Sequence, residues 1–296
     1  MITRRRLLKG MGTAFIGLST AKLGSTVLQQ PRVFEETRRA MGGPFRITAI
    51  GSDPWVLRSS VRVAFEEVWR LERLMTIYQS DSEISRLNQL GETCLSSESM
   101  EVLRKSIFYS HATGGAFDIT LGNYQNLALG FDSARFMKQD MGVDLGGIGI
   151  GYAVDQAIKV LKNRGVRSAL VDGGGEVKSI GSKKDGVSWR VGIRNPFEKT
   201  GFSSIITLDD SAVSTSADYI KPHIIDPRTG KKPMGLASAT IVSADAISAD
   251  ALSTAAFVLG LKSGLKLIEK TPGVEGLLVT TVGEIIESSG FGRYTV

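Results

Sequence analysis

Residues 143–175 read VDLGGIGIGYAVDQAIKVLKNRGVRSALVDGGG. The stretch opens with a glycine-rich loop, and apolar side chains then recur at the spacing of one helix face: Val154, Ile158 and Leu161. Gly165 is suited to end that helix, because glycine readily adopts the left-handed turn that follows many helices. Residues 166–171 are rich in apolar side chains and predict a strand. A loop, a helix and a strand in this order indicate a sheet flanked by helices.

The same patterns predict further elements on both sides of this stretch. Helices are expected over 58–76, 98–112, 248–260 and 262–270, and Ser80-Asp81-Ser82-Glu83 reads as a capping box that opens a short helix through Leu87. Strands are expected over 42–50, 189–193, 204–208, 240–243, 276–281 and 283–288, whereas the residues before Met41 read as a polar connection. Because the order is mixed, we predict an α+β fold with mixed or antiparallel sheets flanked by helices.

The net charge of +6 is concentrated at the N-terminus. Residues 1–30 contain Arg4, Arg5, Arg6, Lys9 and Lys22 and no acidic residue, which leaves +1 for residues 31–296. The remainder of the chain is nearly neutral, so nucleic acid is not an expected partner. The arginines precede a short apolar run interrupted by glycines and resemble a twin-arginine export signal, with a candidate cleavage site at Ser19-Thr20-Ala21. We expect residues 1–30 to be an export signal with its linker, and residues 31–296 to be one domain in the periplasm, tethered to the inner membrane if the signal stays uncleaved.

Two observations limit the other classes of protein. Cys94 is the only cysteine, which excludes a disulfide within the chain and a thiolate metal cluster. No run of 18 or more uncharged apolar residues is present, so we expect no stable membrane span in the mature chain.

Four patches rich in glycine or acid stand out: residues 114–120, 143–152, 172–175 and 222–230. None has the spacing of a dinucleotide-binding fingerprint or of a Walker motif, and each alone is explained equally well as a turn. The second patch runs directly into a helix, however, and backbone N–H groups at a helix start can bind phosphate. It is therefore a candidate pyrophosphate site.

Asp250 and Thr254 lie four residues apart at the start of a helix for which Ser248 is the expected N-cap. This spacing places a carboxylate and a hydroxyl on one helix face, and such oxygen ligands suit Mg²⁺. On spacing alone, an acid favourably placed at a helix N-terminus is the simpler explanation.

The chain has two histidines. His111 falls within an amphipathic helix and is expected to be structural. His223 falls in a polar loop, where a neutral imidazole could act as a general base, although spacing alone favours a structural histidine there too.

Together, these patches resemble the ApbE family of FAD:protein FMN transferases over about residues 41–261. The matching segments are Met41-Gly42, Tyr78, Ser82-Glu83-Ile84, Asn88, Gly115 to Thr120, Asp144 to Gly147, Gly151 to Asp155, Trp189, Val191-Gly192-Ile193, Pro196, Ser214-Thr215-Ser216, His223 to Gly230, Ala249-Asp250-Ala251 and Thr254-Ala255.

The resemblance implies an α+β fold with a tunnelling-fold-like core and a Mg²⁺-dependent reaction. FMN would be transferred from FAD to a threonine or serine hydroxyl of a partner flavoprotein in a membrane or periplasmic redox system, with release of AMP. By position, Gly147, Asp250 and Thr254 would bind the metal, and His223 and Asp250 would be the catalytic residues, with His223 activating the acceptor hydroxyl. The expected FAD contacts are Met41, Tyr78, Ala116, Phe117, Asp118, Asp144 and Ile150.

Some positions depart from the family pattern. Ile150 stands where many relatives carry lysine or another polar residue, Gly149 replaces a common alanine, and Ala217 a common glycine. Gly43 stands where threonine is usual, and Asn123-Tyr124 replaces a usual Pro-Leu pair. Two alternatives therefore stay open: a periplasmic FAD carrier or maturation protein without transferase activity, and a Mg²⁺-dependent FAD pyrophosphatase. Retention of His223, Asp250 and Thr254 favours catalysis, whereas Ile150 favours the carrier.

Overall fold

The computed structural model describes residues 31–183, 186–198, 200–218 and 224–296. The helices are α1 (Pro54–Met75), α2 (Glu83–Leu90), α3 (Ser97–Ala112), α4 (Gly149–Asn163) and α5 (Ala246–Lys270), with short 3-10 turns η1 (Tyr124–Asn126) and η3 (Phe291–Arg293). The strands are β1 (Arg32–Ala40), β2 (Gly43–Gly51), β3 (Glu92–Cys94), β4 (Leu127–Leu129), β5 (Ser133–Phe136), β6 (Ser168–Asp172), β7 (Val177–Ile180), β8 (Trp189–Arg194), β9 (Phe202–Leu208), β10 (Ala212–Ala217), β11 (Leu236–Ser243), β12 (Glu275–Thr280) and β13 (Ile285–Glu287).

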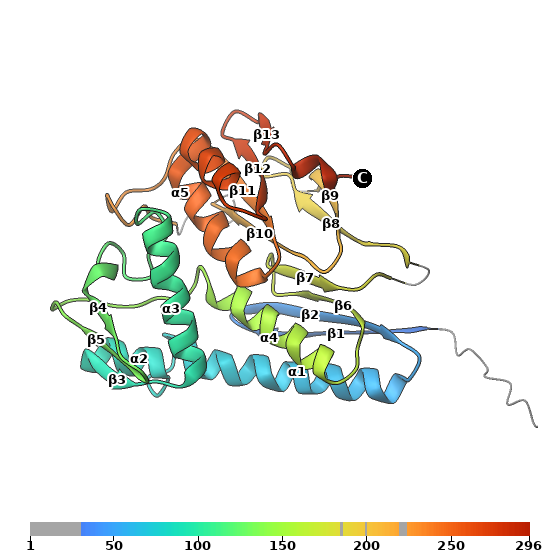
Figure 1. Ribbon diagram of the computed structural model, residues 1–296, viewed down its shortest axis with the longest axis horizontal. Coiled ribbons are helices and arrows are strands. Elements are labelled where there is room, and N and C mark those ends of the chain that lie inside the picture. Colours follow the sequence, from blue (N-terminus) through green and yellow to red (C-terminus); the bar gives the residue numbers. More distant parts are fainter. Residues whose placement is uncertain (1–30, 184–185, 199, 219–223) are drawn as a thin grey trace, which may run out of the picture. The chain divides into compact units, whose positions relative to one another are not determined.

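An eight-stranded sheet organises this part of the chain, in the order β1-β2-β6-β7-β10-β11-β12-β13 (Figure 1). Every neighbouring pair is antiparallel. One face is covered by α1, α4 and α5, and the inward residues of β2, including Phe45 and Ile47, are fully buried there. The arrangement is α+β with antiparallel sheets flanked by helices, which confirms the predicted fold class.

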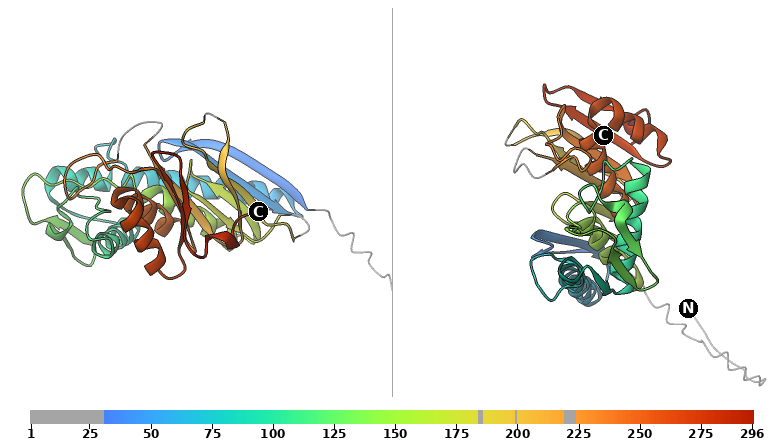
Figure 2. Two further views of the ribbon diagram at one scale, coloured as in Figure 1. Left: turned by 90° about the horizontal axis from the view of Figure 1, so that it is seen from above. Right: turned by 90° about the vertical axis from the view of Figure 1, so that its left-hand side faces the viewer.

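The opposite face of this sheet carries no α-helix of the described residues. It is partly covered by the β8–β9 hairpin and by the short turn η3, whose Phe291 is fully buried there. Trp189 and Ile193 of β8 pack there with Val213 and Val242 of the sheet, forming a second and smaller apolar core. A separate three-stranded sheet, β3-β5-β4, lies with α2 and α3 at the end of the molecule remote from β12 and β13 (Figures 1 and 2).

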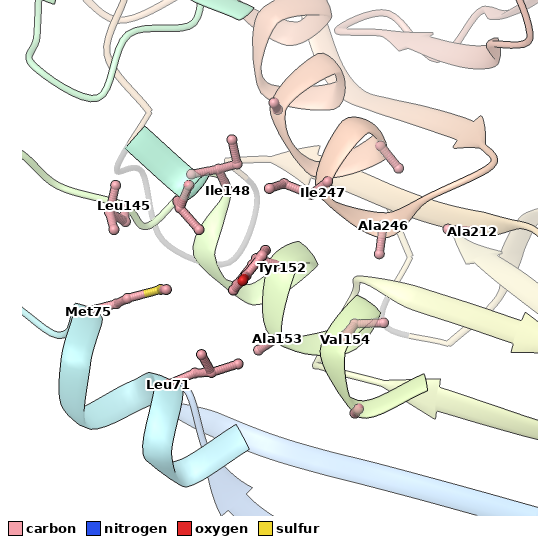
Figure 3. Packing of buried hydrophobic residues seen from close by; sticks show 14 of the residues in the cluster. Leu71, Met75, Leu145, Ile148, Tyr152, Ala153, Val154, Ala212, Ala246 and Ile247 are labelled. Carbon is pink, nitrogen blue, oxygen red and sulfur yellow. The ribbon is translucent and has the colours of Figure 1, made fainter. Parts of the chain in front are cut away.

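Helix α4 lies between α1 and α5 and fixes the position of both (Figure 3). Its contact with α5 depends on Gly151, because a Cβ atom there would come within 2.5 Å of the Ala246 carbonyl oxygen. One turn further on, the Asp155 carboxylate accepts hydrogen bonds from the backbone N–H groups of Ala246 and Ile247, at 3.0 Å each. The first turns of α4 and α5 are therefore held together by backbone contact and by a shared carboxylate.

Three local predictions were wrong: the connection before Met41, the N-cap of α2 and the N-cap of α5. The residues before Met41 form β1, an edge strand in register with β2 over its whole length; its many charged and exposed side chains hide the strand from the sequence pattern. The N-cap of α2 is Ser82, which accepts from the Ser85 N–H, and Glu83 instead accepts hydrogen bonds from the N–H and hydroxyl of Ser96.

The N-cap of α5 is Asp245 rather than Ser248, and the Ser248 N–H donates to the Asp245 carboxylate. The two helices predicted over 248–260 and 262–270 are confirmed as the two segments of α5, which are separated at Gly260, whose φ of 72° lies in the left-handed region. By length and mean hydropathy (1.4), α5 is the one helix of the described residues that could cross a membrane. Half of that apolar window is buried within the protein, where α5 packs on β10 and β11, so we treat it as a core helix.

Candidate active site

Two adjoining clefts lie at the N-terminal end of α4. The first has a volume of about 420 Å³ and the second about 460 Å³. Asp144, Gly146 and Ile150 line both, so the two clefts form one continuous site. The described residues expected at the site all line one cleft or the other: Met41, Tyr78, Ala116, Phe117, Asp118, Asp144, Gly147, Ile150, Asp250 and Thr254.

The floor of the first cleft is the start of α5. Asp250 is 4% exposed, and one of its carboxylate oxygens accepts a hydrogen bond of 3.0 Å from the Gly151 N–H. Thr254 follows one turn later, and its hydroxyl lies 3.1 Å from that of Ser216 on β10. Gly147 is adjacent, since a Cβ atom on it would lie 3.3 Å from the Thr254 Oγ1. Three residues expected to bind a metal are thus brought together from two segments distant in the sequence.

Glu176 is a member of this site that the sequence analysis missed. It follows the glycines of residues 173–175, lines the first cleft and accepts a 3.5 Å hydrogen bond from the Ser214 hydroxyl. Desolvation by the surrounding protein, followed by the negative charge of Asp172, raises the pKa of Glu176 to about 7. Burial likewise raises the pKa of Asp250 well above its ordinary value, and the charge of Glu176 raises it further. Two carboxylates therefore face each other's charge in a place where neither is readily solvated.

A pair of crowded carboxylates is costly unless a proton or a cation offsets the charge. The described residues contain no group of three His, Cys, Asp or Glu side chains arranged to hold a metal. The oxygen-only donors of the first cleft nevertheless fit Mg²⁺, which takes one or two carboxylates and completes its shell with water and substrate phosphate. Asp250, Thr254 and the main chain at Gly147 are the residues suited to hold it, with Glu176 beside them.

The loop after α3 forms the opposite wall. Ala116 and Phe117 are buried, and Phe117 packs edge-on against Tyr109 with ring centroids 6.4 Å apart. The Asp118 carboxylate accepts from the backbone N–H groups of Thr120, Gly122 and Tyr124 and from the Thr120 hydroxyl. Asp118 lines the cleft as expected, and its carboxylate also holds the loop in shape; its contact with FAD stays a prediction.

The second cleft carries an exposed aromatic side chain. Tyr78 is 92% exposed, so its ring is free to stack on a planar ligand. Met41 has a φ of 53°, in the left-handed region that side chains rarely adopt, and this turn brings its side chain to within 3.8 Å of where a Gly149 Cβ would stand. Asp144 lies at the junction of the two clefts, with one carboxylate oxygen accepting from the Gly146 N–H.

The glycine-rich stretch is less free to bind phosphate than its sequence indicates. The helix begins at Gly149, inside the stretch, and the N–H groups of three of the four glycines in residues 146–151 have partners within the protein: Gly146 with Asp144, Gly149 with the Leu145 carbonyl, and Gly151 with Asp250. Ile150 points toward the sheet, since a Cβ atom on Gly173 would lie 2.7 Å from its Cγ2. This apolar side chain therefore stands at the junction of the two clefts, where many relatives were expected to carry a polar one.

His223 lies outside the described residues, and so do Arg4, Arg5 and the rest of the expected export signal. The chain resumes at Ile224, which lines the first cleft together with Ile225 and Pro227. Asp226 forms a two-pronged ion pair with Arg228, at 2.8 and 2.9 Å, which lowers the pKa of Asp226. This ion pair lies within the turn that follows His223 and stabilises its local conformation.

Comparison with known proteins agrees with this geometry. The model of the ApbE family matches residues 41–139 and 123–278. An FAD:protein FMN transferase from Vibrio cholerae is 28% identical over 263 residues, which is 74% of this chain and 78% of that protein. Among solved structures, the ApbE protein from Thermotoga maritima matches with a TM-score of 0.83 at 26% identity, covering 90% of this chain and 100% of that one. The flavinyl transferase ApbE from Pseudomonas stutzeri matches with a TM-score of 0.79 at 28% identity, covering 90% and 98%.

The α+β fold is shared with solved ApbE proteins, one of which is named as a flavinyl transferase. Its first cleft brings together the oxygen donors of Asp250, Thr254 and Glu176. The chain belongs to the ApbE family. The resemblance drawn from the sequence motifs is thereby confirmed, whereas the role of each site residue remains a prediction.

Proposed function

We propose that this protein transfers FMN from FAD to a threonine or serine hydroxyl of a partner flavoprotein and releases AMP, with Mg²⁺ as the essential metal. The observation that carries the proposal is the meeting of Asp250, Thr254 and Glu176 in one cleft that continues into a second cleft with an exposed tyrosine. The names of the relatives support the same reaction. The two clefts offer one polar part for a pyrophosphate and one open part for a flavin ring.

In this proposal the acceptor hydroxyl oxygen forms a bond to the phosphorus of the FMN half of FAD. The bond from that phosphorus to the bridging oxygen breaks, AMP leaves, and the hydroxyl proton passes to His223. When bound, Mg²⁺ would neutralise negative charge on the phosphoryl oxygens. Asp250, Thr254 and Gly147 would hold it, and Tyr78, Met41 and Asp144 would orient the flavin half.

The partner and the location are part of the same proposal. The expected export signal supports a periplasmic enzyme whose acceptor is a flavoprotein of a membrane or periplasmic redox system. An acceptor reached only through export would also account for the signal preceding a domain of this family.

One observation favours a second function, that of an FAD carrier. Ile150 stands at the junction of the clefts and offers neither charge nor hydrogen bond to a phosphate or flavin oxygen. FAD held without a suitably polarised phosphorus would be bound and not cleaved.

One experiment separates these functions. The purified full chain is incubated with FAD and Mg²⁺, with and without solubilised membrane and periplasmic fractions of the source cells, and covalent flavin fluorescence on denaturing gels is measured beside free FMN and AMP. Covalent flavin that appears only with acceptor supports the transferase, and FMN and AMP without acceptor indicate a pyrophosphatase. Bound but intact FAD under all conditions would contradict the proposal and indicate the carrier. Asp250→Ala is the matched control, in which neither product should form.

A further inference from the structure

A third cleft, of about 830 Å³, lies on the face of the main sheet that α1, α4 and α5 do not cover. Strands β2, β6, β7 and β10 form its floor, and the β8–β9 hairpin forms its wall. These strands are labelled in Figure 1. A volume of this size is within the range of ligand-binding clefts. We call it the arginine groove, after Arg46, Arg190 and Arg194, which line it.

The groove has a positive character. Arg190, Gly192 and Arg194 occupy alternate positions of β8, and both arginines are exposed. Neither forms an ion pair with a carboxylate of the described residues, whereas Arg46 is paired with Asp172 at 2.8 Å. Asp172 is the single described acidic residue in the lining, against three arginines. A net positive charge in a concave site favours an anionic occupant.

The groove also offers an aromatic anchor. The Phe202 ring lies over Gly192, where a Cβ atom would come within 2.4 Å of it, and Phe202 is nevertheless 63% exposed. Glycine at this position allows an exposed ring to lie flat on the groove wall. Arginine and aromatic side chains in a recess are characteristic of the centres of protein–protein interfaces.

The β10 strand connects this groove to the active-site cleft. On one face of β10 the Ser216 hydroxyl bonds to Ser253 and Thr254 of α5, next to Asp250. On the other face Val213 lines the groove. Thr215 and Ala217 line both the groove and the first cleft, so the two spaces meet at the C-terminal end of β10.

From these observations we propose that the arginine groove docks an extended, acidic segment of the acceptor protein. The hydroxyl-bearing residue of that segment would lie at the Thr215–Ala217 end of the groove, while FAD occupies the first two clefts. The inference rests on the proposed transferase function, and it assigns the acceptor a separate path to the phosphorus. Charge complementarity selects this occupant, since the acidic side chains would pair with Arg190 and Arg194.

The test uses the full chain and three fluorescein-labelled peptides, each with one central threonine flanked by aspartates, asparagines or lysines. Binding is measured by fluorescence anisotropy, with wild type, the double variant Arg190→Glu/Arg194→Glu and the control Arg167→Glu. Arg167 is an exposed arginine just before β6 that does not line the groove. We expect the aspartate peptide to bind wild type and the control equally and the double variant about tenfold more weakly or worse, because two charge-assisted contacts are lost.

FAD affinity, measured by calorimetry, should be the same in all three proteins, which also shows that the double variant is folded. Equal binding of the aspartate and asparagine peptides, no binding of the aspartate peptide to wild type, or no loss in the double variant would overturn the inference. Displacement of the peptide by equimolar inorganic phosphate or by an oligonucleotide would also overturn it, since the groove would then recognise phosphate in general.

The same samples, supplied with FAD and Mg²⁺, separate this inference from the function on which it rests. If wild type transfers FMN to the aspartate peptide and the double variant does so equally well at low peptide concentration, the groove assignment alone fails. If wild type cleaves no FAD with any acceptor, the proposed function fails, while peptide binding still reports on the groove.

Discussion

Replacing Glu176 by glutamine tests whether a poorly solvated carboxylate in the active-site cleft destabilises the protein at high pH. Glutamine keeps the size of the side chain and removes its ability to ionise. In the folded protein the pKa of Glu176 is about 7, against an ordinary value of 4.5, mainly because the surrounding protein desolvates the carboxylate. The folded state therefore holds a proton that the unfolded chain has already released.

The sign of the pH dependence follows from this difference. The contribution of Glu176 to stability is fully present below pH 4.5, and it is lost as the pH rises through about 7. The whole difference corresponds to about 3 kcal/mol. Part of the side chain faces the cleft and its water, so we expect roughly 1–3 kcal/mol at pH 8. Glu176→Gln should be more stable than wild type by that amount in the absence of divalent cations.

The assay is urea unfolding from pH 4.5 to 8 in EDTA, followed by circular dichroism, with Glu66→Gln on the surface of α1 as the control. The difference between Glu176→Gln and wild type should grow with pH, and the control should stay within about 0.5 kcal/mol of wild type. With excess Mg²⁺ the advantage of the variant should shrink, because a bound cation offsets the same charge. A difference that does not change between pH 4.5 and 8 would refute the assigned cause, since it would show that Glu176 is well solvated in the cleft.

Three further outcomes are expected. Asp250→Ala, or wild type in EDTA, should lose both FMN transfer and FAD hydrolysis, whereas His223→Ala should lose about 10²–10⁴-fold in transfer and keep FAD binding. Equal loss of FAD binding in both variants would show that His223 is structural. Full activity of Asp250→Ala would contradict the metal assignment. Ile150→Lys should bind FAD roughly ten- to a hundredfold more tightly by calorimetry, because lysine can donate a charge-assisted hydrogen bond; unchanged affinity would show that the side chain at 150 does not face FAD. Replacing Arg4 and Arg5 by lysine should retain the protein in the cytoplasm, as fractionation would show, and undiminished periplasmic recovery would contradict twin-arginine export.

The elements that the sequence predicted are those with a strong apolar period. Helix α1 shows Val61, Phe65 and Val68 on one face, and all three are fully buried. Two of the strands that it missed are stabilised by their partners and not by an apolar pattern of their own. β1 is charged and exposed and exists through its register with β2, and β10 contains Ser214, Thr215 and Ser216, whose hydroxyls find partners on neighbouring elements. No local pattern distinguishes such strands from loops.

The site shows the same division. Asp250 and Thr254 could be proposed together because one helix carries both, and family motifs supplied the other expected residues. Glu176 could not be found, because its relation to Asp250 exists only after α5 packs on the main sheet. The signal that was available is weak: an acid directly after three glycines. The carboxylate of Asp118 was also beyond prediction, since its four bonds to the loop depend on turn geometry.

The contact between α4 and α5 also bears on the order of folding. The Asp155 carboxylate accepts a hydrogen bond from the N–H group of Ala246, which is 91 residues away in the sequence. Gly151 and Asp250 are joined in the same way over 99 residues. Contacts over such separations close large loops and form late, after local helices and hairpins. A chain still emerging from the ribosome, or one that has folded only its first half, lacks Glu176, Asp250 and Thr254 and therefore lacks the first cleft. Under the proposed export by the twin-arginine route, FAD held by both clefts would report complete folding and would mark the molecules that are ready for a route that exports folded chains.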